Sequence, residues 1–220
     1  MNNKLFITAA IALGLAHTAV STATADNASK VNYASKVNTL IGTDYTGNTY
    51  PGAQAPFGMV QLSPDNGLPG WDRIAGYFYP DSTIAGFSHT HLSGTGAGDL
   101  YDISFLPVTL PLNDAPAPLG IHSKFSHDDE TAHAGYYQVR LTDYDINVEL
   151  TATPRCGVQR YTFPKNGRQR MVILNLTKAM NWDATKDTKI TQIDKHTIEG
   201  YRFSDGWARN QRVWFRTRFS

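Results

Sequence analysis

The feature that most constrains the fold is a strict alternation of apolar and polar residues, found in segments 137–141, 146–150, 158–161 and 213–219. Because successive side chains of a β-strand point to opposite faces, this pattern predicts strands with one face in a core and one in water. Turn residues separate the segments at short intervals, and we find no long amphipathic helix and no internal repeat. The sequence therefore predicts an all-β fold, an antiparallel β-sandwich.

Three further strands are expected from less regular patterns. One covers Ile74 to Tyr79, and another begins near Ile84 and continues through His91. The apolar run from Met171 to Leu176 predicts a buried strand.

The first 25 residues have the order of a secretory signal peptide. Lys4 precedes an apolar stretch from Leu5 to Val20, and Ala23-Thr24-Ala25 supplies the small residues of a cleavage site. The apolar stretch is too short and too interrupted to span a bilayer, and the alternative is a retained anchor. We therefore expect a periplasmic or secreted bacterial protein, with a polar leader over 26–36 and the sandwich domain over 37–220.

Composition narrows the possible partners. Cys156 is the only cysteine, so an internal disulfide and a thiolate metal cluster are both excluded. The net charge is +1, with lysines and arginines scattered, which does not favour nucleic acid as a partner. No later stretch is long and apolar enough for a membrane span, so we expect no membrane partner.

The last strand, 213–219, ends one residue before the end of the sequence. A flat and partly apolar strand is an unusual end for a domain, because unpaired edges promote aggregation. We therefore expect a domain that is truncated at its C-terminal end. The alternative is that this strand is paired internally and the protein finishes there.

The stretch GFSHTHLSGTGAGD, residues 86–99, places His89 and His91 two residues apart, ahead of a glycine-rich run that ends at Asp99. On a continuous strand both imidazoles would point to one face, where they could bind a metal with further ligands from elsewhere. Structural hydrogen bonding and contact with a sugar are the alternatives. The glycines do not form a phosphate loop, because neither a following lysine nor a helix start is present.

A second candidate is Trp71 with Asp72, in a loop after Gly70. An indole there could stack on a pyranose while the carboxylate accepts sugar hydroxyls, or it could fold back and close the end of the sandwich. We expect structural roles for Trp182 and Trp207, since large aromatic residues favour the core. No spacing of acids marks a glycosidase pair, and no nucleophilic serine motif is present, so we assign no catalytic residue.

Long segments of the chain resemble the N-terminal region of glycoside hydrolase family 92, which comprises exported bacterial exo-acting α-mannosidases, most often α-1,2-specific. The resemblance covers residues 37–220. The segments that carry it include VNTLIGTDYTGNTYPGAQAPFGMVQLSPD, GWDRIAGYFYPDSTIAGFSHTHLSGTGAGDLYDISFLPV, VELTATPRCGVQRYTFP and GYRFSDGWARNQRVWF.

This resemblance implies an N-terminal β-sandwich joined to a larger (α/α)6 barrel, in an enzyme that inverts stereochemistry and uses calcium. It places the catalytic acid, the base and the calcium ligands in the barrel, so this chain alone is expected to hold no catalytic residue and no metal site, and to be inactive. The missing barrel domain and a mannose-containing glycan are the implied partners. The alternative function is a stand-alone mannose-binding module.

The resemblance also implies that a tryptophan of this half contacts the bound sugar. Trp71 matches that position. Asp72, His89, His91 and Asp99 are the further candidates for lining or supporting the same cleft.

Overall fold

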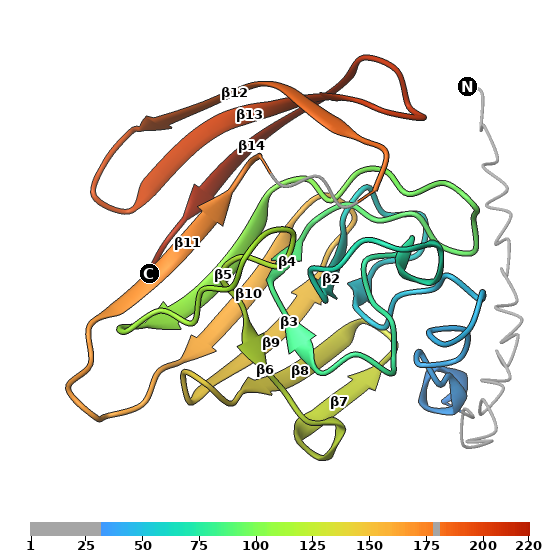
Figure 1. Cartoon of the computed structure of the whole chain (residues 1–220), viewed down its shortest axis with the longest axis horizontal. Coiled ribbons are helices and arrows are strands. Elements are labelled where there is room, and N and C mark those ends of the chain that lie inside the picture. Colours follow the sequence, from blue (N-terminus) through green and yellow to red (C-terminus); the bar gives the residue numbers. More distant parts are fainter. Residues whose placement is uncertain (1–31, 178–180) are drawn as a thin grey trace, which may run out of the picture. The chain divides into compact units, whose positions relative to one another are not determined.

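Antiparallel strands make up nearly all of the regular structure in residues 32–177 and 181–220, which are the residues that the computed structural model describes (Figure 1). The predicted signal peptide and most of the predicted leader lie outside these residues. Tyr33–Ser220 form one unit. The strands are β1 (Ala53–Gln54), β2 (Gln61–Asp65), β3 (Thr83–Ile84), β4 (Gly86–Ser88), β5 (Ser104–Thr109), β6 (Ser123–Lys124), β7 (Glu130–His133), β8 (Tyr136–Leu141), β9 (Ile146–Ala152), β10 (Gly157–Thr162), β11 (Arg170–Asn175), β12 (Ala184–Gln192), β13 (Thr197–Asp205) and β14 (Gln211–Arg218). Three short 3-10 helices accompany them, η1 (Tyr33–Lys36), η2 (Trp71–Arg73) and η3 (His127–Asp129).

Two sheets enclose the main core. One has the order β1-β2-β4-β5-β11 and the other β10-β9-β8-β7, and their inward side chains pack against each other. This packing follows from the alternation of the sequence, because every second residue of β8, and of β9 as far as Leu150, is buried. The fully buried members of this core include Leu62, Phe87, Val108, Val139, Val148 and Leu150.

A third sheet, β12-β13-β14, forms a separate layer beside β5 and β11 (Figure 1). Val213 and Phe215 of β14 pack against a small second core of Ile103, Phe105 and Leu176. β14 pairs with β13 along its whole length and is an edge strand of this sheet. The opposite face of the layer carries exposed side chains, Trp214 among them.

The predicted all-β fold of antiparallel sheets is therefore confirmed. The four alternating segments of the sequence lie in β8, β9, β10 and β14. The chain from 164 to 167 connects β10 in one sheet to β11 in the other, so it crosses the sandwich and does not close a hairpin. No helix in the described residues is long and apolar enough to cross a membrane.

The strand expected over Ile74–Tyr79 is wrong. This segment is a turn whose backbone bonds to a neighbouring loop: the Phe78 N–H donates to Asn66 Oδ1 at 2.5 Å, and the Gly76 carbonyl accepts from the Asn66 N–H at 2.8 Å. Gly76 has a φ of +86°, which an extended strand does not allow. The apolar residues here reflect burial of a loop against the core.

The continuous strand expected from Ile84 through His91 is also wrong. β3 pairs with β6 in a separate two-stranded sheet, β4 pairs with β2 and β5, and β4 ends at Ser88. The two histidines therefore lie beyond the strand, where the rule that residues two apart share a face no longer applies.

Candidate functional site

Trp71 opens η2 and holds its indole out from the protein, with 58% of the residue exposed. It therefore does not close the end of the sandwich. Asp72 beside it accepts from the Arg73 guanidinium at 2.9 Å, and the same guanidinium bonds Asp81 at 2.6 and 2.7 Å. These bonds hold the short helix and leave the Asp72 side chain partly exposed.

The glycine-rich stretch lies directly beneath this loop. We call residues 94–102, between β4 and β5, the brace loop. A side-chain carbon placed on Gly96 would lie 3.4 Å from Cη2 of Trp71, so the indole rests on the backbone of the brace loop. A side-chain carbon on Gly98 would lie 2.5 Å from Cβ of Asn181. Gly98 thus lets the Asn181 segment approach the brace loop more closely than a side chain would allow, whereas the contact at Gly96 is an ordinary one.

The residue after Asn181 is Trp182, which carries a second exposed indole. Trp182, 52% exposed, lies with its ring centroid 5.8 Å from that of Trp71, and the two planes are tilted by 53°. The Gly70 N–H donates to Asn181 Oδ1 at 3.1 Å, and the Trp182 N–H donates to the Gly98 carbonyl at 3.3 Å. Trp71 and Trp182 therefore form one aromatic surface, although 111 positions separate them.

Asp99 joins a third segment to the brace loop. Its carboxylate is fully buried and accepts from the Leu100 N–H at 2.8 Å and from the Ala208 N–H at 2.7 Å. This second bond positions the connection between β13 and β14, where Trp207 is exposed. Asp99 is thus a buried support of the loops. Trp182 and Trp207 do not lie in the core, since both residues are more than half exposed, and the structural roles expected for them stay a prediction.

A buried ion network connects β13 to the brace loop and to the residue after Trp182. The Arg202 guanidinium of β13 bonds Asp102 Oδ1 at 2.6 Å and Asp183 Oδ2 at 2.5 Å, and all three side chains are inaccessible to solvent. Asp102 also accepts from Thr90 Oγ1 at 2.7 Å and from Gln211 Nε2 at 2.5 Å. Because Asp183 follows Trp182 directly, the network holds the second indole in place.

The backbone next to this network adopts unfavourable conformations. Leu100, Tyr101 and Ile103 have φ values of +84°, +57° and +56°. Such values are costly for residues other than glycine, and most of all for a β-branched residue such as Ile103. Backbone strain of this kind persists only where surrounding contacts enforce it, and the bonds of Asp99 and Asp102 supply those contacts.

The two histidines hold the chain between β4 and the brace loop. His91 is buried, with Nδ1 2.7 Å from the Gln61 carbonyl and Nε2 2.9 Å from Asp65 Oδ1. His89 has Nδ1 2.7 Å from the Ile103 carbonyl, and its burial lowers the pKa of the imidazole. The two rings thus bond to different partners. The described residues contain no group of three or more His, Cys, Asp or Glu side chains that could hold a metal ion.

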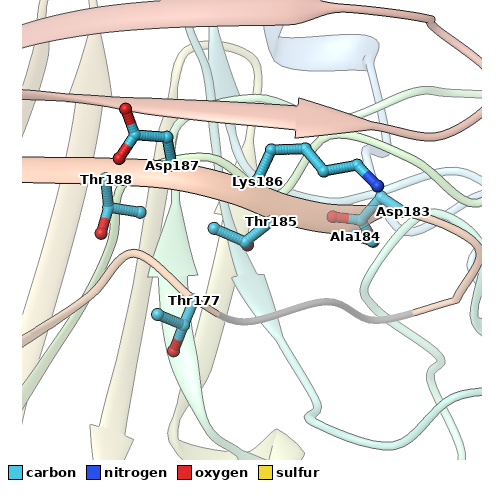
Figure 2. Close-up of a pocket in the computed structure, with 7 residues that line it drawn as sticks. All are labelled: Thr177, Asp183, Ala184, Thr185, Lys186, Asp187 and Thr188. Atoms are coloured by element: carbon cyan, nitrogen blue, oxygen red, sulfur yellow. The ribbon is translucent and has the colours of Figure 1, made fainter.

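A shallow hollow borders this region at the start of β12, and Asp183 of the ion network forms part of its lining (Figure 2). Its volume is about 580 Å³. Its lining is polar and contains no aromatic side chain, so it offers no stacking surface for a sugar. The lining residues are Thr177, Asp183, Ala184, Thr185, Lys186, Asp187 and Thr188.

The structure thus brings most of the predicted site residues into one region. Trp71 and Asp72 are exposed at its surface, whereas His89, His91 and Asp99 lie beneath it as supports. Their part in sugar binding stays a prediction.

Sequence reasoning missed the contact of Trp182 with Trp71 and the role of Arg202. One signal for Arg202 was available. It lies between Tyr201 and Phe203 in a strand, so alternation places its charge on the opposite face from two aromatic residues, and that face is buried.

Comparison with known proteins decides the family. Residues 36–220 match the model of the glycosyl hydrolase family 92 N-terminal domain. The chain belongs to glycoside hydrolase family 92. It is 38% identical to the family 92 α-mannosidase BT3965 of Bacteroides thetaiotaomicron, whose structure in complex with mannoimidazole superposes with a TM-score of 0.78 over 83% of this chain and 24% of that one.

Two other family 92 structures are similar. The glycosyl hydrolase ccman5 is 30% identical, with a TM-score of 0.67 over 83% of this chain and 25% of that one. The inverting mannosidase BT2199 of Bacteroides thetaiotaomicron VPI-5482 is 26% identical, with a TM-score of 0.66 over 85% of this chain and 25% of that one.

A protein of Arthroderma benhamiae named an uncharacterized secreted glycosidase is 28% identical over 177 residues, which are 74% of this chain and 22% of that protein. The chain thus spans about a quarter of the length of its family 92 relatives.

Proposed function

We propose that this chain is the β-sandwich part of an exported α-mannosidase, and that its Trp71 loop forms one side of the cleft for mannose-containing glycans. The observation that carries the proposal is the position of Trp71: its indole is 58% exposed, yet its loop is held by the brace loop and by Asn181. An exposed aromatic ring on a fixed loop is a suitable surface for the apolar face of a sugar.

Asp72 supplies the polar contact in this proposal. Asp72 follows Trp71 directly, and its carboxylate is partly exposed and oriented by the Arg73 guanidinium at 2.9 Å. A carboxylate held in one orientation can accept hydrogen bonds from the hydroxyls of a sugar stacked on the ring. Because the Arg73 guanidinium already donates to the Asp72 carboxylate, this proposal gives Asp72 a role in binding and orienting the sugar, and assigns it no proton transfer.

The proposal places the chemistry in the rest of the enzyme. Inversion needs an acid and a base on opposite sides of the scissile bond, roughly 6.5–9.5 Å apart. The buried carboxylates of the site, Asp99, Asp102 and Asp183, are already held by arginine or backbone N–H donors. They therefore do not fit the role of the acid or the base.

The same carboxylates are poor ligands for the calcium ion that we propose for the full-length enzyme, because arginine or backbone N–H donors already hold them. We assign the acid, the base and the calcium ligands to the helical domain. An α-1,2 linkage preference and export through the signal peptide over residues 1–25 complete the proposal.

An alternative is a stand-alone mannose-binding module. It is favoured by one observation, namely that both exposed indoles and all the supports described above come from this chain alone. Titration of the chain with methyl α-mannoside, followed by NMR, tests it. A module binds with a dissociation constant of roughly 1 mM or tighter, and Trp71→Ala abolishes binding. Trp214→Ala removes a similarly exposed indole from β14 and should change nothing.

A hybrid enzyme tests the main proposal. We would replace the matching quarter of the 38% identical α-mannosidase with this chain and measure mannose release from α-1,2-mannobiose in the presence of calcium. We expect the hybrid to release mannose, Trp71→Ala to slow it about tenfold or more, and the chain by itself to release none. Release at an enzymatic rate by the chain alone would contradict the proposal, as would a hybrid unaffected by Trp71→Ala.

A further inference from the structure

The two sequence neighbours of Trp182 fix its backbone, while its indole is exposed to solvent. Asn181 accepts from the Gly70 N–H at 3.1 Å on one side, and Asp183 bonds the buried guanidinium of Arg202 at 2.5 Å on the other. The Trp182 N–H itself donates to the Gly98 carbonyl at 3.3 Å. The backbone of this residue is therefore fixed while its indole stays 52% exposed.

Exposing this ring has a cost that calls for an explanation. An indole is among the largest apolar surfaces that a protein can bury, and here two of them share one surface with more than half of each residue in water. Clustered and rigidly held exposed aromatic residues are typical of binding sites, whereas isolated ones are common on any surface. The two rings together are such a cluster.

The angle between the rings determines what they can bind. The planes meet at 53° with centroids 5.8 Å apart, so they form a corner and not a flat platform or a parallel clamp. A single pyranose stacked on one ring cannot lie flat on the other. Two consecutive sugar rings can each use one indole, provided that the linkage between them bends.

We propose that Trp182 forms a second sugar subsite beside Trp71, so that the site takes a bent disaccharide or a longer glycan. The inference rests on the proposed function, in which Trp71 binds the first sugar. It adds a residue that discriminates glycans by length and by shape.

Titration with methyl α-mannoside and with α-1,2-mannobiose tests the subsite. The unaltered chain should bind the disaccharide about tenfold more tightly than the monosaccharide, as one additional aromatic contact provides. Trp182→Ala should abolish this advantage and leave monosaccharide binding unchanged, whereas Trp71→Ala should weaken both. Trp182→Phe should keep part of the advantage, which separates loss of the ring from damage to the loop, and Trp214→Ala is the matched control.

The possible outcomes separate the two proposals. If the unaltered chain binds the monosaccharide and the disaccharide equally, or if Trp182→Ala keeps the disaccharide advantage, the second subsite is wrong and the Trp71 site stands. If the monosaccharide is also lost in Trp182→Ala while Trp182→Phe behaves likewise, Trp182 is a support and not a subsite. If the chain binds no sugar at all, the stand-alone module and the second subsite are both wrong, and the Trp71 cleft is then decided by the hybrid enzyme.

Discussion

Replacement of Arg202 by methionine tests whether the buried ion network holds β13 to the brace loop and to the segment before β12. The guanidinium makes hydrogen bonds of 2.6 Å to Asp102, 2.5 Å to Asp183, 3.1 Å to the Leu176 carbonyl and 3.0 Å to the Leu100 carbonyl. Methionine is long enough to fill much of the space but carries no charge. The variant therefore keeps two buried carboxylates and removes their cation.

The expected loss of stability is large. Breaking a buried ion pair by removing one partner costs about 3–5 kcal/mol, which is a substantial share of the roughly 5–15 kcal/mol that stabilises a domain. With a urea dependence of about 2 kcal/mol per molar, the unfolding midpoint should fall by about 2 M. Arg216→Met is the matched control, since Arg216 pairs with Glu199 at 2.6 Å but its side chain is 67% exposed. Its cost should stay below about 1 kcal/mol.

Equilibrium unfolding in urea, followed by circular dichroism, measures both variants. A second substitution, Asp183→Asn, should recover part of the stability lost in Arg202→Met, because it removes one of the carboxylates left without its guanidinium. Equal midpoint shifts for Arg202→Met and Arg216→Met would refute the reasoning. So would an Arg202→Met protein that is as stable as the unaltered chain, because the network would then contribute nothing beyond the volume it fills.

Further predictions concern the brace loop and its histidine. Gly98→Ala should cost about 1–3 kcal/mol, since the new carbon lies 2.5 Å from Cβ of Asn181, whereas Gly96→Ala makes an ordinary 3.4 Å contact and should cost less than about 0.5 kcal/mol; equal urea midpoints would contradict this. Burial lowers the pKa of His89, so only the unfolded chain gains this proton as the pH falls below about 6.5, and stability should drop by at most ~1.4 kcal/mol per pH unit. His89→Gln can still donate to the Ile103 carbonyl and should flatten the stability curve between about pH 7 and pH 5; superimposable curves would show that His89 is not responsible.

Prediction from the sequence succeeded where a local pattern decides the structure. β8 and β9 alternate buried and accessible residues over their whole length, and their strand pairing follows that alternation. It failed over Ile74–Tyr79, a turn whose apolar residues are largely buried, so that their composition resembles that of a buried strand. A run of apolar residues indicates that a segment is buried, but it does not distinguish an extended strand from a buried loop.

The sequence by itself determined the all-β class and the family, because periodicity and long motifs are properties of contiguous residues. It left open whether Trp71 is exposed, which the structure decided. Only the tertiary structure decided that Asp99 supports the loops, that Arg202 is buried between Asp102 and Asp183, and that Trp182 meets Trp71 at an angle. Most of these contacts join segments 100 or more residues apart, and their geometry depends on how the β12–β14 layer packs on the brace loop. No pattern within a single segment encodes that packing.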